Sequence, residues 1–500
     1  MSEHERRNVL RYAGLTLAAG VGAATGTVAA QETVTDESAD GESTTDESVT
    51  ADGSSGWPSI RGDAGNTGFA PGSTGPKSPV GVAWEYDHGG TFAVGDGTVY
   101  LVADDGQVRA IDAVDGSLQW ETEITVASRE EPVEAMGPPA VAHDTVYVTS
   151  KGDEPNLTAL DVASGDVRWQ ESDLGSETNL SPTVADELVF LLADKVLYAL
   201  DAHDGERRWQ FEPGTVTTDD GRERGDYLQR DSVAVAGGTV FALSNKRLIA
   251  LDAETGDERW TDGVEDWASN TFSGRPIAAD GVVAAAKADV VTIYDAETGA
   301  ERSTIPTHSL DVLTDDRVYA VTDAETGDRK TVTGYDSETG DRVWQPSDGN
   351  GSYASAVVDD DSVYVGLEES GVAAFARADG SGKWRVDTGT EPQQVAVVGE
   401  TVYVGGDALF AIRTEGEEQG DVGDDGEDES ASDDGNESAG AGNESTNDTG
   451  NESTAGSENE STNDTGNESS DETPGFTAGT SIAGGVLALE WLRRRTGDDE

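Results

Sequence analysis

Short apolar runs separated by acidic turns recur along most of this chain of 500 residues. RLIALD, residues 247–252, has the length and composition of a β-strand, in which alternate side chains point to opposite faces. Eight such runs carry a β-branched or aromatic pair, at Val99-Tyr100, Val146-Tyr147, Val189-Phe190, Val240-Phe241, Val282-Val283, Val318-Tyr319, Val363-Tyr364 and Val402-Tyr403. The pattern predicts an all-β fold built from repeats.

The turn after each run has its own signature, seen most clearly in LDAETGDERW, residues 251–260. Asp252 can cap the turn through its carboxylate, Gly256 supplies a positive φ, and Trp260 begins the next strand. The turn glycines are Gly116, Gly165, Gly205, Gly256, Gly299, Gly340 and Gly380, and the tryptophans that follow them are Trp120, Trp169, Trp209, Trp260, Trp344 and Trp384. Gly299 is followed at that position by Ser303, so one unit lacks its indole. We interpret the tryptophans as structural anchors that dock each unit on a neighbour, because one unit alone cannot bury its face.

Eight units spaced at about 36 to 51 residues are typical of propeller blades rather than of helical solenoids. The last unit, TVYVGGDALFAIRTE, has no Gly-x-x-x-Trp strand, whereas VGVAWEYDHGG, residues 80–90, offers a strand with Trp84 and no unit before it. We therefore predict an eight-bladed β-propeller of four-stranded antiparallel blades. The Trp84 strand completes the last blade and closes the ring, which removes exposed sheet edges.

The repeat unit D-x-x-[TSD]-G-x-x-x-W, together with the opening WPSIRGDAGNTGFAP at residues 57–71, resembles the PQQ-like β-propeller repeats. That family includes quinoprotein alcohol dehydrogenases and BamB-type outer-membrane assembly scaffolds. The resemblance covers residues 57–414 and implies the propeller fold. It leaves two functions open, since one fold hosts enzymes and binding modules alike.

Composition narrows the setting of the protein. Asp and Glu total 100 against 32 for Lys and Arg, giving a net charge of −68 that would repel nucleic acid. A folded chain this acidic and poor in Lys is similar to proteins of extremely halophilic archaea, where high salt screens self-repulsion. The chain has no Cys, which excludes disulfides, thiolate metal sites and Cys nucleophiles.

The N-terminal residues have the features of an export signal. Arg6 and Arg7 precede an Ala- and Gly-rich apolar stretch, so residues 1–30 resemble a twin-arginine signal, with an ordinary Sec signal as the alternative. Residues 31–56 form an acidic linker. Both alternatives predict that the mature protein leaves the cytoplasm.

The C-terminal residues predict a stalk and an anchor. Residues 415–473 offer almost nothing to bury and are expected to be disordered. They carry seven sequons, at Asn436, Asn443, Asn447, Asn451, Asn459, Asn463 and Asn467, which favour N-glycosylation. Pro474, Gly475 and Phe476 open a tail, residues 474–500, that resembles the archaeal PGF-CTERM sorting signal. The resemblance implies processing by an archaeosortase and attachment to the membrane. A plain transmembrane anchor is the alternative.

No sequence motif assigns chemistry. The chain has no EF-hand loop, P-loop, G-x-S-x-G elbow or H-E-x-x-H motif, so we expect no catalytic residues and no metal ligands and leave cofactor-binding residues unassigned. Among five histidines, His308 stands out because it follows the unit without a Trp. The charged loops 128–137 and 217–231 break the repeat spacing, and such insertions gather on a propeller face, where they shape a binding surface.

The sequence thus favours an exported, surface-anchored, non-catalytic binding or scaffold propeller of a halophilic archaeon, with a protein or glycan partner at the cell surface and no cofactor. The alternative is a dehydrogenase that uses PQQ and Ca²⁺ and faces the cell exterior.

Overall fold

A computed structural model describes residues 56–416, except for 127–130, 151–155, 173, 176–180, 219–220, 230–231, 264–270, 280, 324–328 and 348–351. Several expectations lie outside the described residues: the export signal with Arg6 and Arg7, the linker up to residue 55, the stalk from residue 417 with its sequons, and the tail with Pro474, Gly475 and Phe476. The chain divides into residues 1–420 and 421–500, and the described part belongs to the first unit. Within that part, no helix combines the length and hydrophobicity needed to cross a bilayer.

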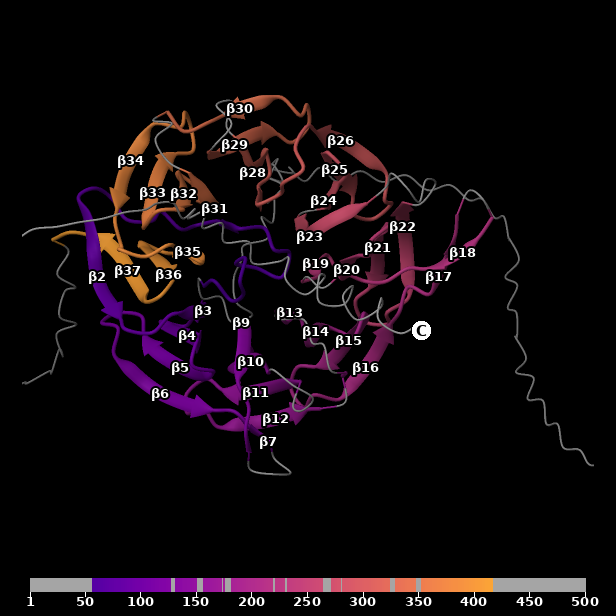
Figure 1. The fold of residues 1–500 in the computed structure, drawn as a ribbon, viewed down its shortest axis with the longest axis horizontal. Coiled ribbons are helices and arrows are strands. Elements are labelled where there is room, and N and C mark those ends of the chain that lie inside the picture. The colour runs from indigo at the N-terminus through magenta and orange to yellow at the C-terminus, as the bar shows by residue number, and fades with distance from the viewer. Residues whose placement is uncertain are drawn as a thin grey trace, which may run out of the picture. The chain divides into compact units, whose positions relative to one another are not determined.

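The described residues form a ring of eight sheets, or blades, which confirms the predicted eight-bladed β-propeller (Figure 1). The strands of blade 1 are β3 (Gly90–Gly95), β4 (Thr98–Ala103), β5 (Gln107–Asp112) and β6 (Leu118–Glu123). Those of blade 2 are β9 (Ala135–Ala142), β10 (Thr145–Ser150), β11 (Leu157–Asp161) and β12 (Val167–Glu171). Blade 3 has β13 (Thr183–Ala185), β14 (Leu188–Ala193), β15 (Val196–Asp201) and β16 (Arg207–Phe211). Blade 4 has β19 (Ala234–Ala236), β20 (Thr239–Leu243), β21 (Arg247–Asp252) and β22 (Glu258–Gly263).

The remaining four blades follow the same plan. Blade 5 has β23 (Phe272–Ala279), β24 (Val282–Lys287), β25 (Val290–Asp295) and β26 (Glu301–Ile305). Blade 6 has β27 (Val312–Leu313), β28 (Arg317–Asp323), β29 (Lys330–Asp336) and β30 (Arg342–Trp344). Blade 7 has β31 (Tyr353–Asp359), β32 (Ser362–Leu367), β33 (Val372–Ala376) and β34 (Gly382–Val386), and blade 8 has β35 (Gln394–Val398), β36 (Thr401–Gly405) and β37 (Leu409–Thr414) together with β2 (Val80–Tyr86). Successive strands of each blade are antiparallel. The first strand of each blade lies nearest the centre of the ring, and the fourth lies at the outside.

Burial explains the composition of the strands. The second strand of a blade is covered on both faces by neighbouring blades, so β4, TVYLVA, is buried along its whole length. The outermost strand meets solvent, and β6, LQWETE, has only exposed and half-buried positions. The core therefore consists of apolar clusters between neighbouring blades, such as the one that joins Phe190 of blade 3 to Val240 of blade 4.

The ring closes as the sequence predicts. β2 pairs antiparallel with β37, with Val80 opposite Thr414 and Trp84 opposite Ala411. Blade 8 therefore combines an N-terminal strand with three C-terminal strands, and Figure 1 shows the two colours side by side.

The segment Trp57–Gly75 runs across one end of the ring, a feature that the repeat pattern did not predict. It exchanges backbone hydrogen bonds with Val94 of blade 1, Val141 of blade 2, Val235 of blade 4, Ala278 of blade 5, Leu313 of blade 6, Val358 of blade 7 and Gly399 after β35 of blade 8. Trp57 is completely buried, and β1 (Phe69–Ala70) adds a parallel strand to β31. We call residues 57–75 the strap, because they connect blades that are distant in sequence.

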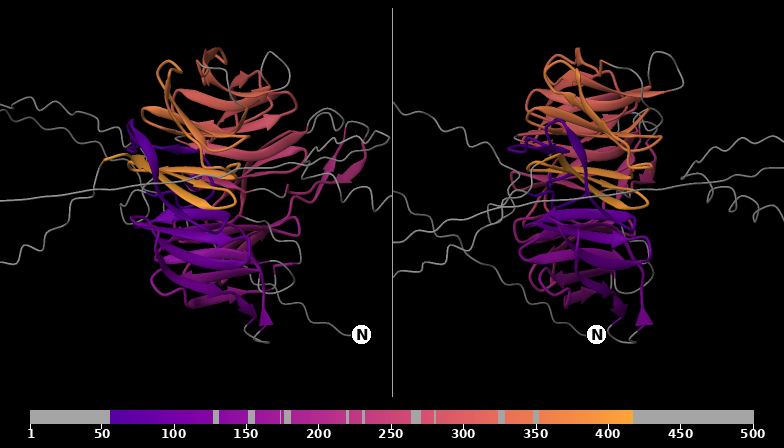
Figure 2. Two further views of the ribbon diagram at one scale, coloured as in Figure 1. Left: turned by 60° about the vertical axis from the view of Figure 1, so that its left-hand side comes forward. Right: turned by 90° about the vertical axis from the view of Figure 1, so that its left-hand side faces the viewer.

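The opposite end of the ring carries the insertions. The strap binds at the turns between first and second strands, so the links from one blade to the next emerge at the other end. Two of these links form hairpins, β7 (Thr125–Val126) with β8 (Glu131–Pro132), and β17 (Thr215–Thr217) with β18 (Glu223–Gly225). Figure 2 shows both hairpins projecting from the same end, which we call the loop face.

Candidate binding cleft between blades 5 and 6

The tryptophans of the outer strands bond to the following blade. Each indole Nε1 donates to a carbonyl at the start of the next Asp-to-Gly turn: Trp84 to Ala113, Trp120 to Val162, Trp169 to Ala202, Trp209 to Ala253, Trp260 to Ala296 and Trp344 to Ala376. The exception is Trp384 of blade 7, which donates to Pro76 O at 3.0 Å, because the turn of blade 8 is interrupted where β37 ends and β2 begins.

The turn glycines provide the room for these contacts. Gly256 has φ of +75°, and a Cβ on it would lie 2.7 Å from Cδ2 of Trp209. Gly116, Gly165, Gly205 and Gly299 meet Trp84, Trp120, Trp169 and Trp260 in the same way. The Gly and the Trp of one sequence repeat thus belong to two different junctions between blades.

The turn aspartates hold the turns in shape. Asp252 Oδ1 accepts hydrogen bonds from the backbone N–H of Glu254 and of Thr255, at 3.1 and 2.9 Å, and its Oδ2 lies 2.8 Å from Arg259 Nη2. The hydrogen bond from Arg259 is the main reason that the pKa of Asp252 is lowered to about 2. Asp161, Asp201 and Asp295 pair with Arg168, Arg208 and Arg302 in the same way. These acidic turns are therefore structural.

The junction of blades 5 and 6 lacks the indole. In blade 4, Phe241, Ala250 and Trp260 lie side by side across three strands, and the rings of Phe241 and Trp260 are 5.9 Å apart. The same places in blade 5 hold Ala284, Ile293 and Ser303. The Ser303 hydroxyl donates to Ser337 O of blade 6. A Cβ on Gly340 of blade 6 would meet the carbonyl of Thr304 at 2.5 Å, and one on Gly380 of blade 7 would likewise meet the carbonyl of Gln345.

A cleft of ≈ 310 Å³ lies at this junction of blades 5 and 6. Its lining comes from the link after β26, from the ends of β28 and β30, and from one face of β29: Pro306, Thr307, His308, Thr322, Asp323, Thr331, Thr333, Tyr335, Arg342 and Gln345. The volume is at the lower end of the range of small-molecule sites, about 300 to 1,000 Å³. His308, the histidine that the sequence singled out, is exposed and lines this cleft.

The cleft lies beside the junction that lacks an indole, although Ser303 itself is not part of the lining. Tyr335 of blade 6 and Tyr294 of blade 5 hold equivalent places in the third strand of their blades. At the junction of blades 4 and 5, the Trp260 ring covers Tyr294 at a centroid distance of 6.3 Å. At the junction of blades 5 and 6, Ser303 stands in place of that indole, and Tyr335 lines the cleft. Burial raises the pKa of Tyr335, and the Arg342 guanidinium opposes that rise.

The floor of the cleft is polar and uncharged. The hydroxyls of Thr322 and Thr333 are 3.2 Å apart, and Gln345 Nε2 donates to Thr333 Oγ1 at 3.3 Å. Two charged side chains lie in the lining, Asp323 and Arg342, and they have opposite signs. Hydroxyl and amide groups both donate and accept hydrogen bonds, so the floor matches a ligand that does the same.

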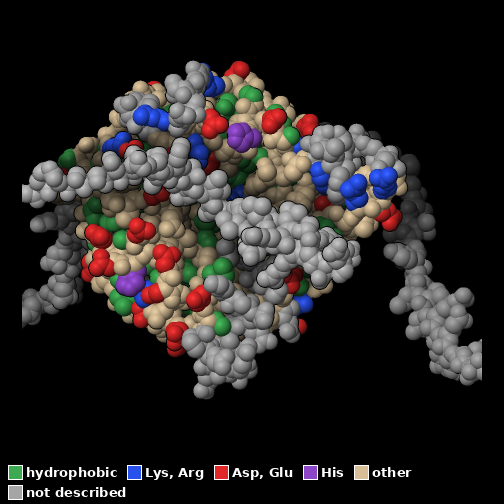
Figure 3. Space-filling view, viewed as in Figure 1, with side chains coloured by type: hydrophobic (Ala, Val, Ile, Leu, Met, Phe, Trp, Pro, Cys, Tyr) green, Lys and Arg blue, Asp and Glu red, His purple; other side chains and the backbone are tan. Residues whose placement is uncertain are grey.

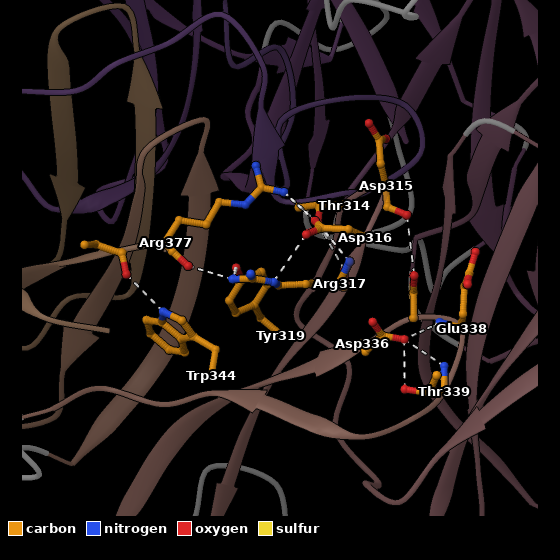
Figure 4. A network of polar contacts seen from close by, with 12 residues as sticks. Thr314, Asp315, Asp316, Arg317, Tyr319, Asp336, Glu338, Thr339, Trp344 and Arg377 are labelled. Atoms are coloured by element: carbon orange, nitrogen blue, oxygen red, sulfur yellow. Dashed lines mark hydrogen bonds and ion pairs between the residues drawn. The ribbon is translucent and has the colours of Figure 1, made fainter. Parts of the chain in front are cut away.

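The other face of blade 6 is closed by charged contacts, as Figure 4 shows. Arg377 of blade 7 donates from Nη2 to Asp316 Oδ1 at 2.7 Å and to Thr314 Oγ1 at 3.1 Å, and its own carbonyl accepts from Arg317 at 2.6 Å. Trp344 donates to the adjacent Ala376 carbonyl. Blade 6 is therefore closed by charged contacts on the side of blade 7 and has a cleft on the side of blade 5. The side that faces blade 5 is the candidate site.

The loop face around the cleft carries mixed charge. In Figure 3, acidic side chains are spread over blade 1, and basic side chains gather over the β17–β18 hairpin. Arg222 and Arg224 of that hairpin are exposed. Tyr227 is exposed as well, and Lys195 Nζ lies 4.3 Å from its ring centroid.

The described residues show no cofactor site. Among them, no group of three or more His, Cys, Asp or Glu side chains is arranged to hold a metal ion. Two polar side chains near the centre of the ring serve the fold: Gln394 bonds both the N–H and the carbonyl of Phe92, and Asn66 donates to Val233 O at 2.8 Å. We therefore derive no step through PQQ or Ca²⁺.

The closed ring of four-stranded blades, most of them joined to the next through an indole that bonds to a turn of that blade, defines a PQQ-like β-propeller. The chain belongs to the family described as outer membrane protein assembly factor BamB, whose model matches residues 19–178, 126–345 and 261–424.

Known proteins similar to this chain fall into several functional classes. BamB of Yersinia pestis is 27% identical over 179 residues, which are 34% of this chain and 41% of that protein. A quinohemoprotein alcohol dehydrogenase of Comamonas testosteroni is 28% identical over 193 residues, 38% of this chain and 22% of the enzyme. The serine/threonine-protein kinase AfsK of Streptomyces coelicolor is 32% identical over 170 residues, 27% of this chain and 20% of the kinase. The chain thus spans between about a fifth and two fifths of the length of these relatives.

Solved structures show the same fold. The structure of BamB from Moraxella catarrhalis matches with a TM-score of 0.52 at 17% identity, covering 68% of this chain and 99% of that one. The quinohemoprotein alcohol dehydrogenase of Comamonas testosteroni matches with a TM-score of 0.55 at 15% identity, covering 71% of this chain and 80% of the enzyme.

Proposed function

We propose that this protein is a non-catalytic binding or scaffold propeller, exported and anchored at the cell surface of a halophilic archaeon. The observation that carries the proposal is the difference between the two ends of the ring. The strap occupies one end through backbone hydrogen bonds to distant blades, whereas the other end holds the inserted hairpins and the cleft beside His308. Loops on a rigid scaffold are where binding residues concentrate.

The family supports a binding role. The Yersinia pestis relative is named an outer membrane protein assembly factor, a role that consists of contacts with other proteins. For this chain, the loop face is the surface that would meet a protein or glycan partner. The acidic composition of the chain as a whole argues against a nucleic acid as that partner.

The experiment is crosslinking of the protein in its native envelope, followed by mass spectrometry. A reactive residue placed in the β17–β18 hairpin is expected to capture a defined partner, and one placed in a turn at the strap end, such as at Asp115, serves as the matched control. Equal capture from both ends would contradict the assignment of the loop face.

The anchor is tested on the same material. Removal of the tail after Pro474, Gly475 and Phe476 by an archaeosortase, with lipid on the new C-terminus, is the expected result. A mature protein that retains RRRTGDDE would refute the sorting signal and leave a plain membrane anchor.

A PQQ- and Ca²⁺-dependent dehydrogenase is the second candidate, supported by the similarity to the Comamonas testosteroni enzyme. Purified protein incubated with PQQ and Ca²⁺ would be assayed for bound quinone and for dye-linked alcohol oxidation. Turnover above that of the protein without quinone would overturn the non-catalytic proposal.

A further inference from the structure

The cleft lies at the junction of blades 5 and 6, where the repeat lacks the tryptophan of its outer strand. The other tryptophan-bearing outer strands among the described residues each send an indole Nε1 to a carbonyl beside them. In β26 the equivalent residue is Ser303, and the aromatic residue beside it is replaced by Ala284. A buried indole contributes several kcal/mol by its area, so leaving it out costs stability that another role would offset.

We infer that this cleft is a binding site for a neutral, hydroxyl-rich ligand of the carbohydrate class. The inference rests on the proposed binding function and names the chemistry of its ligand. It follows from three properties of the lining, which are its hydrogen-bonding groups, its charge and its aromatic ring.

The hydrogen-bonding groups are of mixed donor and acceptor type. Thr322, Thr331 and Thr333 lie on facing stretches of β28 and β29, and Gln345 adds an amide next to Thr333. A row of hydroxyls with an amide suits ligand hydroxyls, which also donate and accept. Thr322, Thr333 and Gln345 already bond to one another, and each hydroxyl keeps the capacity for a further hydrogen bond to a ligand.

The charges select against ionic ligands. Asp323 and Arg342 are the two charged side chains of the lining apart from His308, and they cancel. An anion would find the single guanidinium Arg342 together with an opposing carboxylate. A cation would find the single carboxylate Asp323 together with an opposing guanidinium. A neutral ligand can use both side chains, since vicinal hydroxyls donate to a carboxylate and accept from a guanidinium.

The aromatic ring gives the ligand an apolar face to lie on. Tyr335 lines the cleft where Trp260 covers its counterpart Tyr294 in the preceding junction. Tyr335 is 8% exposed, so only a small part of its ring faces the cleft, beside the polar groups of the lining. Pro306 adds a second apolar surface on the side of blade 5.

The test uses saturation-transfer NMR on the purified full chain in high salt. The neutral probes are glucose, galactose, mannose and maltose, and gluconate and glucosamine serve as anionic and cationic counterparts. We expect at least one neutral sugar to bind, and the two charged compounds to bind at least 10-fold more weakly.

Three variants locate the binding. Ser303→Trp restores the indole of the repeat and is expected to abolish the signal while keeping or raising the melting temperature. Thr333→Val removes one hydroxyl from the floor and should weaken binding about 3- to 10-fold, the loss of one hydrogen bond. Thr292→Val is the matched control: Thr292 holds the place of Thr333 in blade 5, where Trp260 already fills the junction, so binding should not change.

The outcomes separate the inference from the proposed function. Absence of binding by every neutral sugar, tighter binding of a charged counterpart, or binding that survives both Ser303→Trp and Thr333→Val would overturn the inference. If Ser303→Trp does not fold, the comparison of Thr333→Val with Thr292→Val decides. Capture of an envelope protein without sugar binding would leave the proposed function intact, whereas quinone-dependent turnover would refute that function without affecting the sugar measurement.

Discussion

Trp84 Nε1 donates to the carbonyl of Ala113 at 3.0 Å, and this hydrogen bond joins the closing strand of blade 8 to the turn between β5 and β6 of blade 1. The Trp84 indole also lies against Tyr403 of its own blade, with ring centroids 6.0 Å apart. One side chain therefore binds both sides of the seam where the two ends of the chain meet.

Trp84→Ala tests that seam. The change is expected to lower the free energy of unfolding by about 3 to 5 kcal/mol, as for other buried aromatic truncations, and to speed amide exchange along β37 because β2 is released. Hydrogen exchange with mass spectrometry reads the second effect. Trp169→Ala should destabilise the protein similarly while leaving β37 protected. Unchanged exchange of β37 in Trp84→Ala would mean that β2 stays paired without its indole.

Gly256→Ala tests the contact between turn and indole. The alanine would have to adopt φ of +75°, and its Cβ would lie 2.7 Å from the Trp209 ring. Gly97→Ala is the control, because Gly97 has φ of +72° with no atom within 4 Å of the Cβ position. We expect Gly97→Ala to cost about 1 to 2 kcal/mol from the backbone alone, and Gly256→Ala to cost about 1 to 3 kcal/mol more from overpacking. Equal losses in chemical denaturation would show that Trp209 moves aside freely.

The lowered pKa of a turn aspartate leads us to predict that the fold loses stability in acid. The pKa of Asp252 is lowered to about 2, so this group contributes stability that is present above its unfolded pKa of about 3.9 and is lost as pH falls through the folded value. Asp252→Asn keeps a side-chain oxygen for the N–H groups of Glu254 and Thr255 but loses the charge that pairs with Arg259. Its unfolding free energy should therefore fall less between pH 4 and pH 2 than that of the wild type. Parallel pH profiles in equilibrium unfolding would contradict a role for this ion pair.

Asn66 is a test of the strap. Its Nδ2 donates to Val233 O at 2.8 Å, the residue is 2% exposed, and its φ is +60°. Asn66→Ala removes the donor and keeps the strained backbone, so we expect a loss of about 2 to 4 kcal/mol. Asn66→Gly removes the same donor without the strain and should be milder by about 1 kcal/mol. Thermal melts of the two variants give the comparison. A stable Asn66→Ala protein would show that the Asn66 side chain is not needed to hold the strap on blade 4.

The sequence predicted those parts of the fold that repeat locally. Asp252, Gly256 and Trp260 report a turn and a strand within ten residues, and their recurrence is enough to count eight blades. Ring closure followed because Trp84 and the last unit each lack what the other supplies. The strap could not be predicted from the sequence. WPSIRGDAGNTGFAP has no alternation of apolar and polar residues, and its hydrogen bonds go to residues as distant as Val358.

The candidate cleft was only half visible in the sequence. Ser303 marked a unit without its indole, and His308 stood out because it follows that unit. The repeat does not reveal, however, that the Trp of one blade packs on the glycine of the next, so the missing indole could not be assigned to the wall of blade 6. Tyr335 and Thr333, in the strand before the turn, carried no signal of their own, because their side chains matter only once blade 5 is placed opposite them.

The pairing of β2 with β37 also determines how the ring would respond to mechanical tension. A pull on the chain at Glu415 would reach Thr414 first, and β37 is held on one side by β2 and on the other by β36. To extract that strand, the force must break hydrogen bonds along both edges, including those of a segment that enters from the opposite terminus. Tension applied at this point would therefore load an inner strand of blade 8 and not an edge strand.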